Sequence, residues 1–456
     1  MEGYALGRSY RPGEQVALCI SALRRTKASV VVQRLGMEVN TVKTLSVDVK
    51  PKPLPRGASE QGCGWDEEGR GDVTFEVPAA WSPGLYRVSL QDMSDDRRLH
   101  PGEAFFVVRD PEPGKRSKVL LMLATNTYFA YNNYGSSRGA DGRSTNGSFY
   151  EKAKHASFLR PMPLGFLSPY DCRAGGPTSR QARYAGWDKW EWPFVRWAEH
   201  EGHTLEYATN EDLDRAPGLL KAYRLVLSVG HDEYWSASMR DAMEEYVRTG
   251  GNAAYLSGNV CYRKVGFDRA GSRLTLAGEM DGDALWSHRS GPNRPENRLT
   301  GVSFCYGALN PDPVPYRVYR PDHWLFDGLW TMRRNSGEFP LLGRIGYECD
   351  GCDLEWNNGV PVASGRDSTP EGFQVLAVAP GRMPDYEATV HSKALFNRPD
   401  GFTPWGQDLR RGAAVMGMWK PGGTVLTVGC TEWAKHLHDP LVARVTQNIF
   451  QKLAAG

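Results

Sequence analysis

The hydrophobic pattern of the chain changes at residues 110–117, a short segment of proline, glycine and charged residues. Before this segment, short apolar and β-branched stretches alternate with polar residues and turns. These stretches lie at residues 15–20, 29–33, 72–77, 81–90 and 104–109. Several short strands at this spacing are typical of two packed antiparallel sheets. We therefore expect an Ig-like β-sandwich at residues 1–112, followed by a linker.

After the linker, buried strands alternate with helices. The predicted strands lie at residues 118–124, 204–208, 225–229, 253–257 and 423–429, and the predicted helices at 187–200, 236–248 and 441–453. This alternation predicts a parallel sheet with helices on both faces. We expect one α/β catalytic domain at residues 116–456, resembling flavodoxin or class I glutamine amidotransferases, with an irregular β-rich insertion at about 262–410.

Charge and apolar patterning exclude several classes of partner. The 456 residues include 55 basic and 53 acidic side chains, a balance that argues against a dedicated nucleic-acid or anionic-membrane surface. The strongest apolar run, residues 119–124, is far too short to span a membrane. The first residues show no basic start followed by an apolar run, so we expect no signal peptide. Eight scattered cysteines favour reduced thiols and a cytoplasmic protein.

Polar loops follow three of the predicted strands. They lie at residues 125–135, 230–236 and 258–259, and a fourth polar loop at 167–171 could fold over the same edge. Ligands of parallel sheets bind beyond the carboxyl ends of the strands. We therefore expect these loops to meet and to supply Tyr, Asn, His, Asp and Glu side chains.

Each of these side chains also has a structural explanation. Tyr131 could simply pack at the rim of the sheet with its polar tip in water. His231 and Glu233 could compensate a helix dipole, and Asn259 could be a turn residue. Cys349 and Cys352 have the spacing of metal ligands, but no second pair of ligands completes a zinc site.

Common catalytic motifs are missing from the sequence. No Gly-x-Gly-x-x-Gly follows a strand, no Walker loop is present, and no Gly-x-Ser-x-Gly elbow joins a predicted strand directly to a predicted helix. The loop at residues 230–236 also contains no cysteine, so a nucleophile of the glutamine-amidotransferase kind is not supported there.

The loops do resemble one known family. In order, residues 127–133, 168–170, 230–235 and 258–259 resemble the C-terminal catalytic region of the N,N-dimethylformamidase large (β) subunit. Residues 346–350 and 423–433 are also similar to that family, so the resemblance covers most of the chain.

The resemblance implies a mononuclear ferric ion held by two tyrosinates and one glutamate. At the matching positions these ligands would be Tyr131, Tyr170 and Glu233. Anionic oxygen donors suit a hard cation, and three protein ligands leave a position open for water or substrate.

The implied reaction is hydrolysis of a small amide, an N-substituted formamide or a related non-peptide C–N bond. The iron would act as a Lewis acid, with Glu348 as the general base for water and acid for the amine. His231 and Asn259 would orient the substrate and donate to the developing oxyanion. Glu355 or Glu432 could replace Glu348 in this role.

Partners and rival functions remain open at this stage. The family's large subunit works with a small subunit, so a small-subunit partner and a homo-oligomer are both considered. One rival is a metal-free amidotransferase-like or trehalose-utilisation-like α/β protein that binds a sugar or small metabolite. A second rival is a binding or structural module without catalysis.

Overall fold

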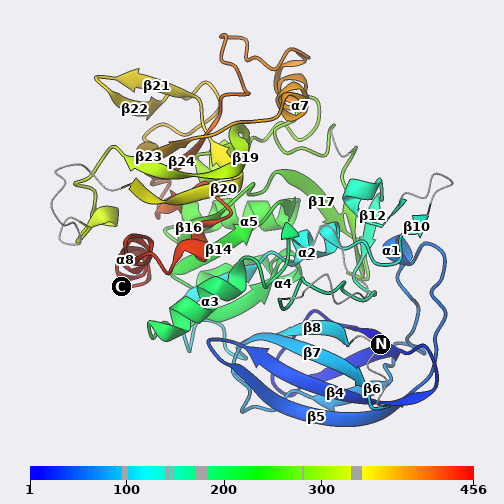
Figure 1. Ribbon diagram of the computed structural model, residues 1–456. Helices are drawn as coiled ribbons and strands as arrows, with labels where there is room; N and C mark the ends of the chain where they lie inside the picture. Colours follow the sequence, from blue (N-terminus) through cyan, green and yellow to red (C-terminus); the bar gives the residue numbers. More distant parts are fainter. Residues whose placement is uncertain are drawn as a thin grey trace. The chain divides into compact units, whose positions relative to one another are not determined.

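The computed structural model describes residues 1–94, 101–138, 144–145, 147–169, 183–279, 282–329 and 341–455. These residues form two compact units, each built from separate stretches of the chain (Figure 1). Unit 1 comprises Met1–Ser117, Thr125–Arg215 and Gly266–Leu276, and unit 2 comprises Lys118–Ala124, Ala216–Val265 and Ala277–Gly456. This division differs from the predicted domains 1–112 and 116–456, because residues 125–215 belong with the N-terminal residues.

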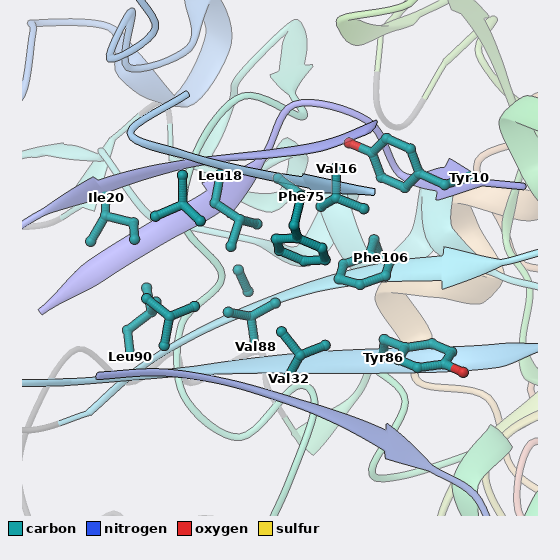
Figure 2. Packing of buried hydrophobic residues seen from close by; sticks show 14 of the residues in the cluster. Tyr10, Val16, Leu18, Ile20, Val32, Phe75, Tyr86, Val88, Leu90 and Phe106 are labelled. Atoms are coloured by element: carbon teal, nitrogen blue, oxygen red, sulfur yellow. The ribbon is translucent and has the colours of Figure 1, made fainter. Parts of the chain in front are cut away.

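The N-terminal part of unit 1 contains two sheets that share one hydrophobic core. The sheet orders are β1-β3-β6 and β2-β8-β7-β4-β5. The strands are β1 (Glu2–Ala5), β2 (Ser9–Tyr10), β3 (Gln15–Ser21), β4 (Thr26–Leu35), β5 (Val39–Val49), β6 (Val73–Glu76), β7 (Gly84–Asp92) and β8 (Gly102–Val108), and α1 (Ala58–Gln61) lies between β5 and β6. Figure 2 shows Leu18 and Phe75 of one sheet packed with Val88 and Phe106 of the other. Alternate residues of β3, β4, β7 and β8 supply this core, because successive side chains of a strand point to opposite faces of the sheet.

The remainder of unit 1 contains short helices and strands. They are α2 (Thr125–Tyr131), β10 (Ser137–Arg138), β11 (Ser144–Thr145), η1 (Phe149–Glu151), β12 (His155–Ser157), α3 (Glu191–His200), β13 (Glu206–Thr209), α4 (Asn210–Arg215) and β18 (Arg273–Leu276). The predicted loop at residues 125–135 is wrong in its first half, because residues 125–131 form a helix with every side chain buried.

Polar contacts of two glutamates, the buried Glu206 and the half-buried Glu199, tie residues 191–215 to the rest of unit 1. Glu206 accepts hydrogen bonds from the backbone N–H groups of Gly114, Arg116 and Ser117 at 2.9–3.0 Å. Arg34 of β4 forms an ion pair of 2.5 Å with Glu199 of α3. Burying a carboxylate is costly unless it is paired, so these contacts determine where residues 191–215 pack within unit 1.

Unit 2 contains a mixed sheet with the neighbour order β9-β14-β16-β25-β24-β23-β19-β20. The strands are β9 (Val119–Leu123), β14 (Leu225–His231), β16 (Asn252–Gly258), β25 (Val425–Thr427), β24 (Ala413–Trp419), β23 (Gln374–Pro380), β19 (Ser303–Val318) and β20 (Leu341–Gly351). Strands β9, β14, β16 and β25 pair in parallel, and the pairs from β25 onward are antiparallel. Residues from the predicted insertion therefore supply strands to the sheet. Assignment to a flavodoxin-like or class I glutamine-amidotransferase-like fold stays a prediction.

Helices and shorter strands complete unit 2. They are η4 (Pro217–Ala222), β15 (Tyr234–Ser236), α5 (Ala237–Arg248), α6 (Asn297–Thr300), η5 (Trp324–Phe326), β21 (Leu354–Asn357), β22 (Val360–Ala363), α7 (Asp385–Phe396), η7 (Trp433–His436), α8 (Pro440–Ile449) and η8 (Phe450–Ala454). Strand β17 (Arg263–Phe267) begins in unit 2, and its last two residues belong to unit 1. The predicted start of α5 is confirmed, because the Ser236 side chain accepts a hydrogen bond from Met239 N. Among the described residues, every helix is too short or too polar to cross a membrane.

The cysteines of the described segments are all thiols. Seven of the eight lie in these segments, and each is buried and free of a disulfide. Cys172 lies outside the described residues.

Candidate active site

Unit 2 brings His231 and Glu348 into direct contact. His231 ends β14, and Glu348 lies near the end of β20. The His231 Nε2 atom is 2.6 Å from Glu348 Oε2, and both side chains are buried. This imidazole–carboxylate pair joins residues that are 117 positions apart in the sequence.

Asn259 joins the same cluster from the loop after β16. Its Nδ2 atom donates a hydrogen bond to Glu348 Oε2 at 3.1 Å. Its Oδ1 atom is buried and has no hydrogen-bond partner among the described residues. A buried acceptor without a partner costs free energy, which is regained when a donor on a bound molecule or water reaches it.

Glu233 is held between two cationic side chains. Its Oε1 atom accepts a hydrogen bond from Arg263 Nε at 2.9 Å, and its Oε2 atom lies 3.4 Å from His231 Nε2. The parallel pairing of β15 with β17 sets this contact, because Arg263 lies opposite Tyr234, the residue after Glu233. Sequence reasoning missed Arg263, which is the first residue of β17, a strand that begins shortly after the loop at 258–259.

Asp350 is a second residue that sequence reasoning missed. Its Oδ1 atom accepts a hydrogen bond from Asn259 N at 2.7 Å, and its Oδ2 atom accepts one from Val260 N at 3.2 Å. The signal was available, because residues two apart in a strand share a face and Asp350 follows Glu348 by two.

The segment at residues 428–431 connects β16 to β20. On one side, Cys430 N donates to Ser257 O at 3.1 Å. On the other side, Thr431 N donates to Glu348 O at 3.1 Å, and Asp350 N donates to Gly429 O at 3.0 Å. These bonds hold the carboxylates of β20 beside the carboxyl ends of β14 and β16.

Burial and neighbouring charges shift two of these pKa values. Burial opposes the charged form of His231, but the carboxylates of Glu348 and Glu233 outweigh it and raise the pKa of His231 well above its usual value. Burial raises the pKa of Asp350 to about 7, against the opposing effect of the two backbone N–H groups that it accepts from. The cluster therefore contains an imidazolium between carboxylates and a carboxyl group that titrates near neutrality.

Unusual backbone conformations surround the cluster. Asn259, Cys261 and Tyr347 adopt left-handed conformations with φ of 51°, 56° and 47°. Asparagine tolerates this region, but a bulky residue such as Tyr347 rarely occupies it. Tyr347 directly precedes Glu348, and its ring packs edge-on against His231 with centroids 5.8 Å apart. Strain of this kind concentrates at functional sites.

The two remaining glutamates considered from the sequence have other partners. Glu355 pairs with Arg366 at 3.1 Å and is exposed, and Glu432 pairs with Lys435 at 2.9 Å. Glu348 is thus the one of the three that contacts His231.

Of the two predicted tyrosine ligands, the structure describes only Tyr131. Tyr131 belongs to unit 1, where it is buried at the end of α2 and its hydroxyl accepts a hydrogen bond from Tyr150 at 2.7 Å. Tyr170 lies outside the described residues. Within the described segments, no group of three or more His, Cys, Asp or Glu side chains is arranged to hold a metal ion. The ferric site stays a prediction.

Chemically, the cluster combines a proton carrier with hydrogen-bond donors. Glu348 can accept or deliver a proton, while His231 and Asn259 both present N–H groups beside it. Together, fold and site define a protein with a mixed sheet and a buried His–Glu–Asn cluster beside the carboxyl ends of its parallel strands, the edge at which parallel sheets bind ligands.

Comparison with known proteins identifies the family. The model of the family "N,N-dimethylformamidase beta subunit-like, C-terminal" matches residues 29–448. The chain therefore belongs to this family, and the resemblance drawn from its loops is confirmed.

Two relatives carry the same name as the family. The N,N-dimethylformamidase beta subunit of Paracoccus aminophilus is 28% identical over 436 residues, covering 85% of this chain and 54% of that protein. The beta subunit from an Alcaligenes species is 28% identical over 342 residues, covering 64% of this chain and 42% of that protein. The chain thus spans about half the length of these relatives. A Bacteroides uniformis β-glucuronidase structure aligns with 57% of this chain and 28% of its own, at 12% identity and a TM-score of 0.14, too low to indicate a shared fold.

Proposed function

We propose that this chain hydrolyses a small, non-peptide amide such as an N-substituted formamide. The observation that carries the proposal is the buried contact of Glu348 with both His231 and Asn259, in a chain whose relatives are named as dimethylformamidase subunits. General acid–base groups and oxyanion donors are what amide hydrolysis requires of a protein.

Each side chain of the cluster has an assigned role. Glu348 takes a proton from the attacking water and delivers it to the nitrogen of the departing amine. The amide nitrogen of Asn259 carries two N–H groups, of which one contacts Glu348, and we assign the other to the carbonyl oxygen of the substrate. His231, held by the carboxylates beside it, orients the substrate and adds a second donor to the developing oxyanion.

A ferric ion fits the chemistry of the proposed ligand set. Tyr131, Tyr170 and Glu233 would hold it, since phenol and carboxylate oxygens are hard donors. Glu233 is buried, and its Oε1 and Oε2 atoms lie 2.9 Å from Arg263 Nε and 3.4 Å from His231 Nε2. Bound there, the ion would supply Lewis-acid activation of the amide carbonyl.

A substrate panel tests the reaction class. The purified chain, supplied with iron, is incubated with N,N-dimethylformamide, N-methylformamide and acetamide, and the release of amine and acid is measured. A set of monosaccharides and trehalose is tested in parallel for binding by calorimetry. We expect release of amine from at least one amide. Binding of a sugar without turnover of any amide would favour the metal-free rival.

Metal content tests the cofactor separately. Elemental mass spectrometry of the wild-type chain, purified without chelators, is expected to find about one iron per chain. Tyr170→Phe should lose most of this iron, because a hard cation loses one of its anionic donors. Tyr386→Phe, an exposed tyrosine of α7, is the matched control and should keep it. Metal-free wild-type protein would contradict the proposal.

A further inference from the structure

Asp350 makes an unusual pair of contacts beside the cluster. Its carboxylate accepts hydrogen bonds from two successive backbone N–H groups, those of Asn259 and Val260. The carboxylate is buried, and β20 presents it on the same face as Glu348. Strand β20 therefore contacts residues 259–260 twice. Asp350 binds their backbone N–H groups, and Glu348 binds the side chain of Asn259.

The loop needs such an anchor. Asn259 adopts a left-handed backbone conformation with φ of 51°, which costs free energy relative to extended or helical backbone. The conformation turns its N–H toward Asp350 while its amide group reaches Glu348. Without the carboxylate of Asp350, two buried N–H groups lose their acceptor and the loop can relax.

We propose that Asp350 is a positioning residue, which fixes residues 259–260 so that the Asn259 amide stays in register with Glu348. This inference rests on the function proposed above. Asp350 acts through Asn259 and does not itself contact the substrate.

Substitution of Asp350 by asparagine removes the negative charge and keeps the shape of the side chain. Asp350→Asn has nearly the volume of aspartate, but one of its two acceptor oxygens becomes an NH₂ group that faces a backbone N–H. The side chain can then accept from one of the two N–H groups and must repel the other. Asp350→Glu keeps both acceptor oxygens and serves as the rescue variant.

A double-mutant cycle tests the route of action. Asp350→Asn is expected to lower kcat about 10- to 100-fold on the amide that the panel identifies, with little change in KM, because the lost donor acts in the transition state. Asn259→Ala and the double variant Asn259→Ala with Asp350→Asn should then have nearly the same kcat, because Asp350 has nothing left to position. Asp350→Glu should recover part of the loss. Fully multiplicative effects would overturn the proposal.

Asp367 provides a matched control in the same unit. It is also buried, and its carboxylate accepts from the backbone N–H groups of Asp353 at 2.7 Å and Thr369 at 3.0 Å. Asp367→Asn thus disrupts the same arrangement, a carboxylate that accepts from two backbone N–H groups, at a different loop. Its kcat and KM should equal those of the wild type. An equal loss of kcat in both variants would show a general effect on folding and overturn the role of Asp350.

Hydrogen exchange tests, without any substrate, whether Asp350 holds the backbone N–H groups of Asn259 and Val260. In Asp350→Asn, a peptide covering residues 259–261 should exchange its amides about tenfold faster or more than in the wild type, and Asp367→Asn should leave it unchanged. Unchanged exchange in Asp350→Asn would overturn the proposal. If the wild-type chain hydrolyses no amide, the proposed function fails, and this measurement alone decides on Asp350. If Asp350→Asn does not fold, Asp350→Glu replaces it in both experiments, with smaller effects of the same sign.

Discussion

At the scale of single residues, close approach of the backbone decides what Gly258 can be. A Cβ atom at this position would lie 2.5 Å from Glu348 O and 2.8 Å from Thr431 N. The glycine therefore lets β16 approach β20 closely enough for Asn259 and Glu348 to meet.

We expect Gly258→Ala to separate these strands. The free energy of unfolding should fall by about 1–3 kcal/mol, as for other overpacked sites, and amide turnover should fall with it. Chemical denaturation and steady-state kinetics measure the two effects. Gly218→Ala, where a Cβ atom would meet nothing within 4 Å, is the control. Equal behaviour of both variants would contradict the account of Gly258.

Glu296 gives a prediction on pH. Burial raises its pKa to about 7, well above the value of about 4.3 in an unfolded chain. The folded state therefore keeps a proton that the unfolded state releases, so this group stabilises the fold below about pH 4 and loses that contribution as the pH rises through 7. Between pH 5 and pH 8 the wild type should lose about 2 kcal/mol more stability than Glu296→Gln, whose side chain stays neutral.

Urea unfolding at both pH values measures this difference. Glu355→Gln, at an exposed glutamate, is the control and should follow the wild-type profile. Parallel profiles for the wild type and Glu296→Gln would show that Glu296 is ionised in the folded protein at pH 5.

Some residues of the cluster could be predicted from the sequence, and others could not. His231, Glu233 and Asn259 follow buried strands, so the rule for parallel sheets finds them. Glu348 came from the family resemblance, because periodicity says nothing about where a residue of a long β-rich segment will lie. Asp350 and Arg263 were missed, since their importance arises from contacts with backbone and side chains far away in the sequence.

Among the helices and strands, α5 begins directly after β15, the short strand that follows Glu233. Ser236 caps the helix three residues after Glu233, and its side chain accepts from Met239 N at 3.2 Å. Removing the cap leaves a helix N–H without a partner.

Ser236→Ala should therefore lower the free energy of unfolding by about 1 kcal/mol. Ser236→Gly, which keeps a backbone suited to the cap position, should lower it by only a few tenths of a kcal/mol. Thermal or chemical denaturation of the two variants compares them. A larger loss in the glycine variant would show that the hydroxyl does not act as the cap.

Elements with strong local signals could be predicted, and those set by distant pairing could not. The strands β14 and β16 follow from short apolar runs and the helix α5 from helical periodicity. The helix α3 begins at Glu191 with Pro193 in its first turn, where proline is tolerated. By contrast, α2 was taken for a loop because its side chains are buried on all sides and lack an amphipathic pattern. The place of β20 depends on backbone hydrogen bonds to residues 429–431, which no local pattern reports.

At the scale of the molecule, the chain interleaves two compact units. Unit 2 carries the acid–base cluster, and unit 1 carries the two N-terminal sheets together with Tyr131. Local patterns cannot reveal this interleaving, because it depends on contacts between distant residues, such as the ion pair of Glu199 and the hydrogen bonds of Glu206. Family membership, by contrast, was visible from the order of the loops alone.

The proposed hydrolysis depends on Glu348 as its acid–base group. The most direct measurement is kcat/KM for amine release by the wild type, Glu348→Gln and Glu355→Gln, each with its iron content determined. Glu348→Gln should lose about 100- to 10,000-fold in kcat/KM while keeping its metal and fold, because glutamine cannot transfer the proton. Glu355→Gln should equal the wild type. Full activity of Glu348→Gln would contradict the account.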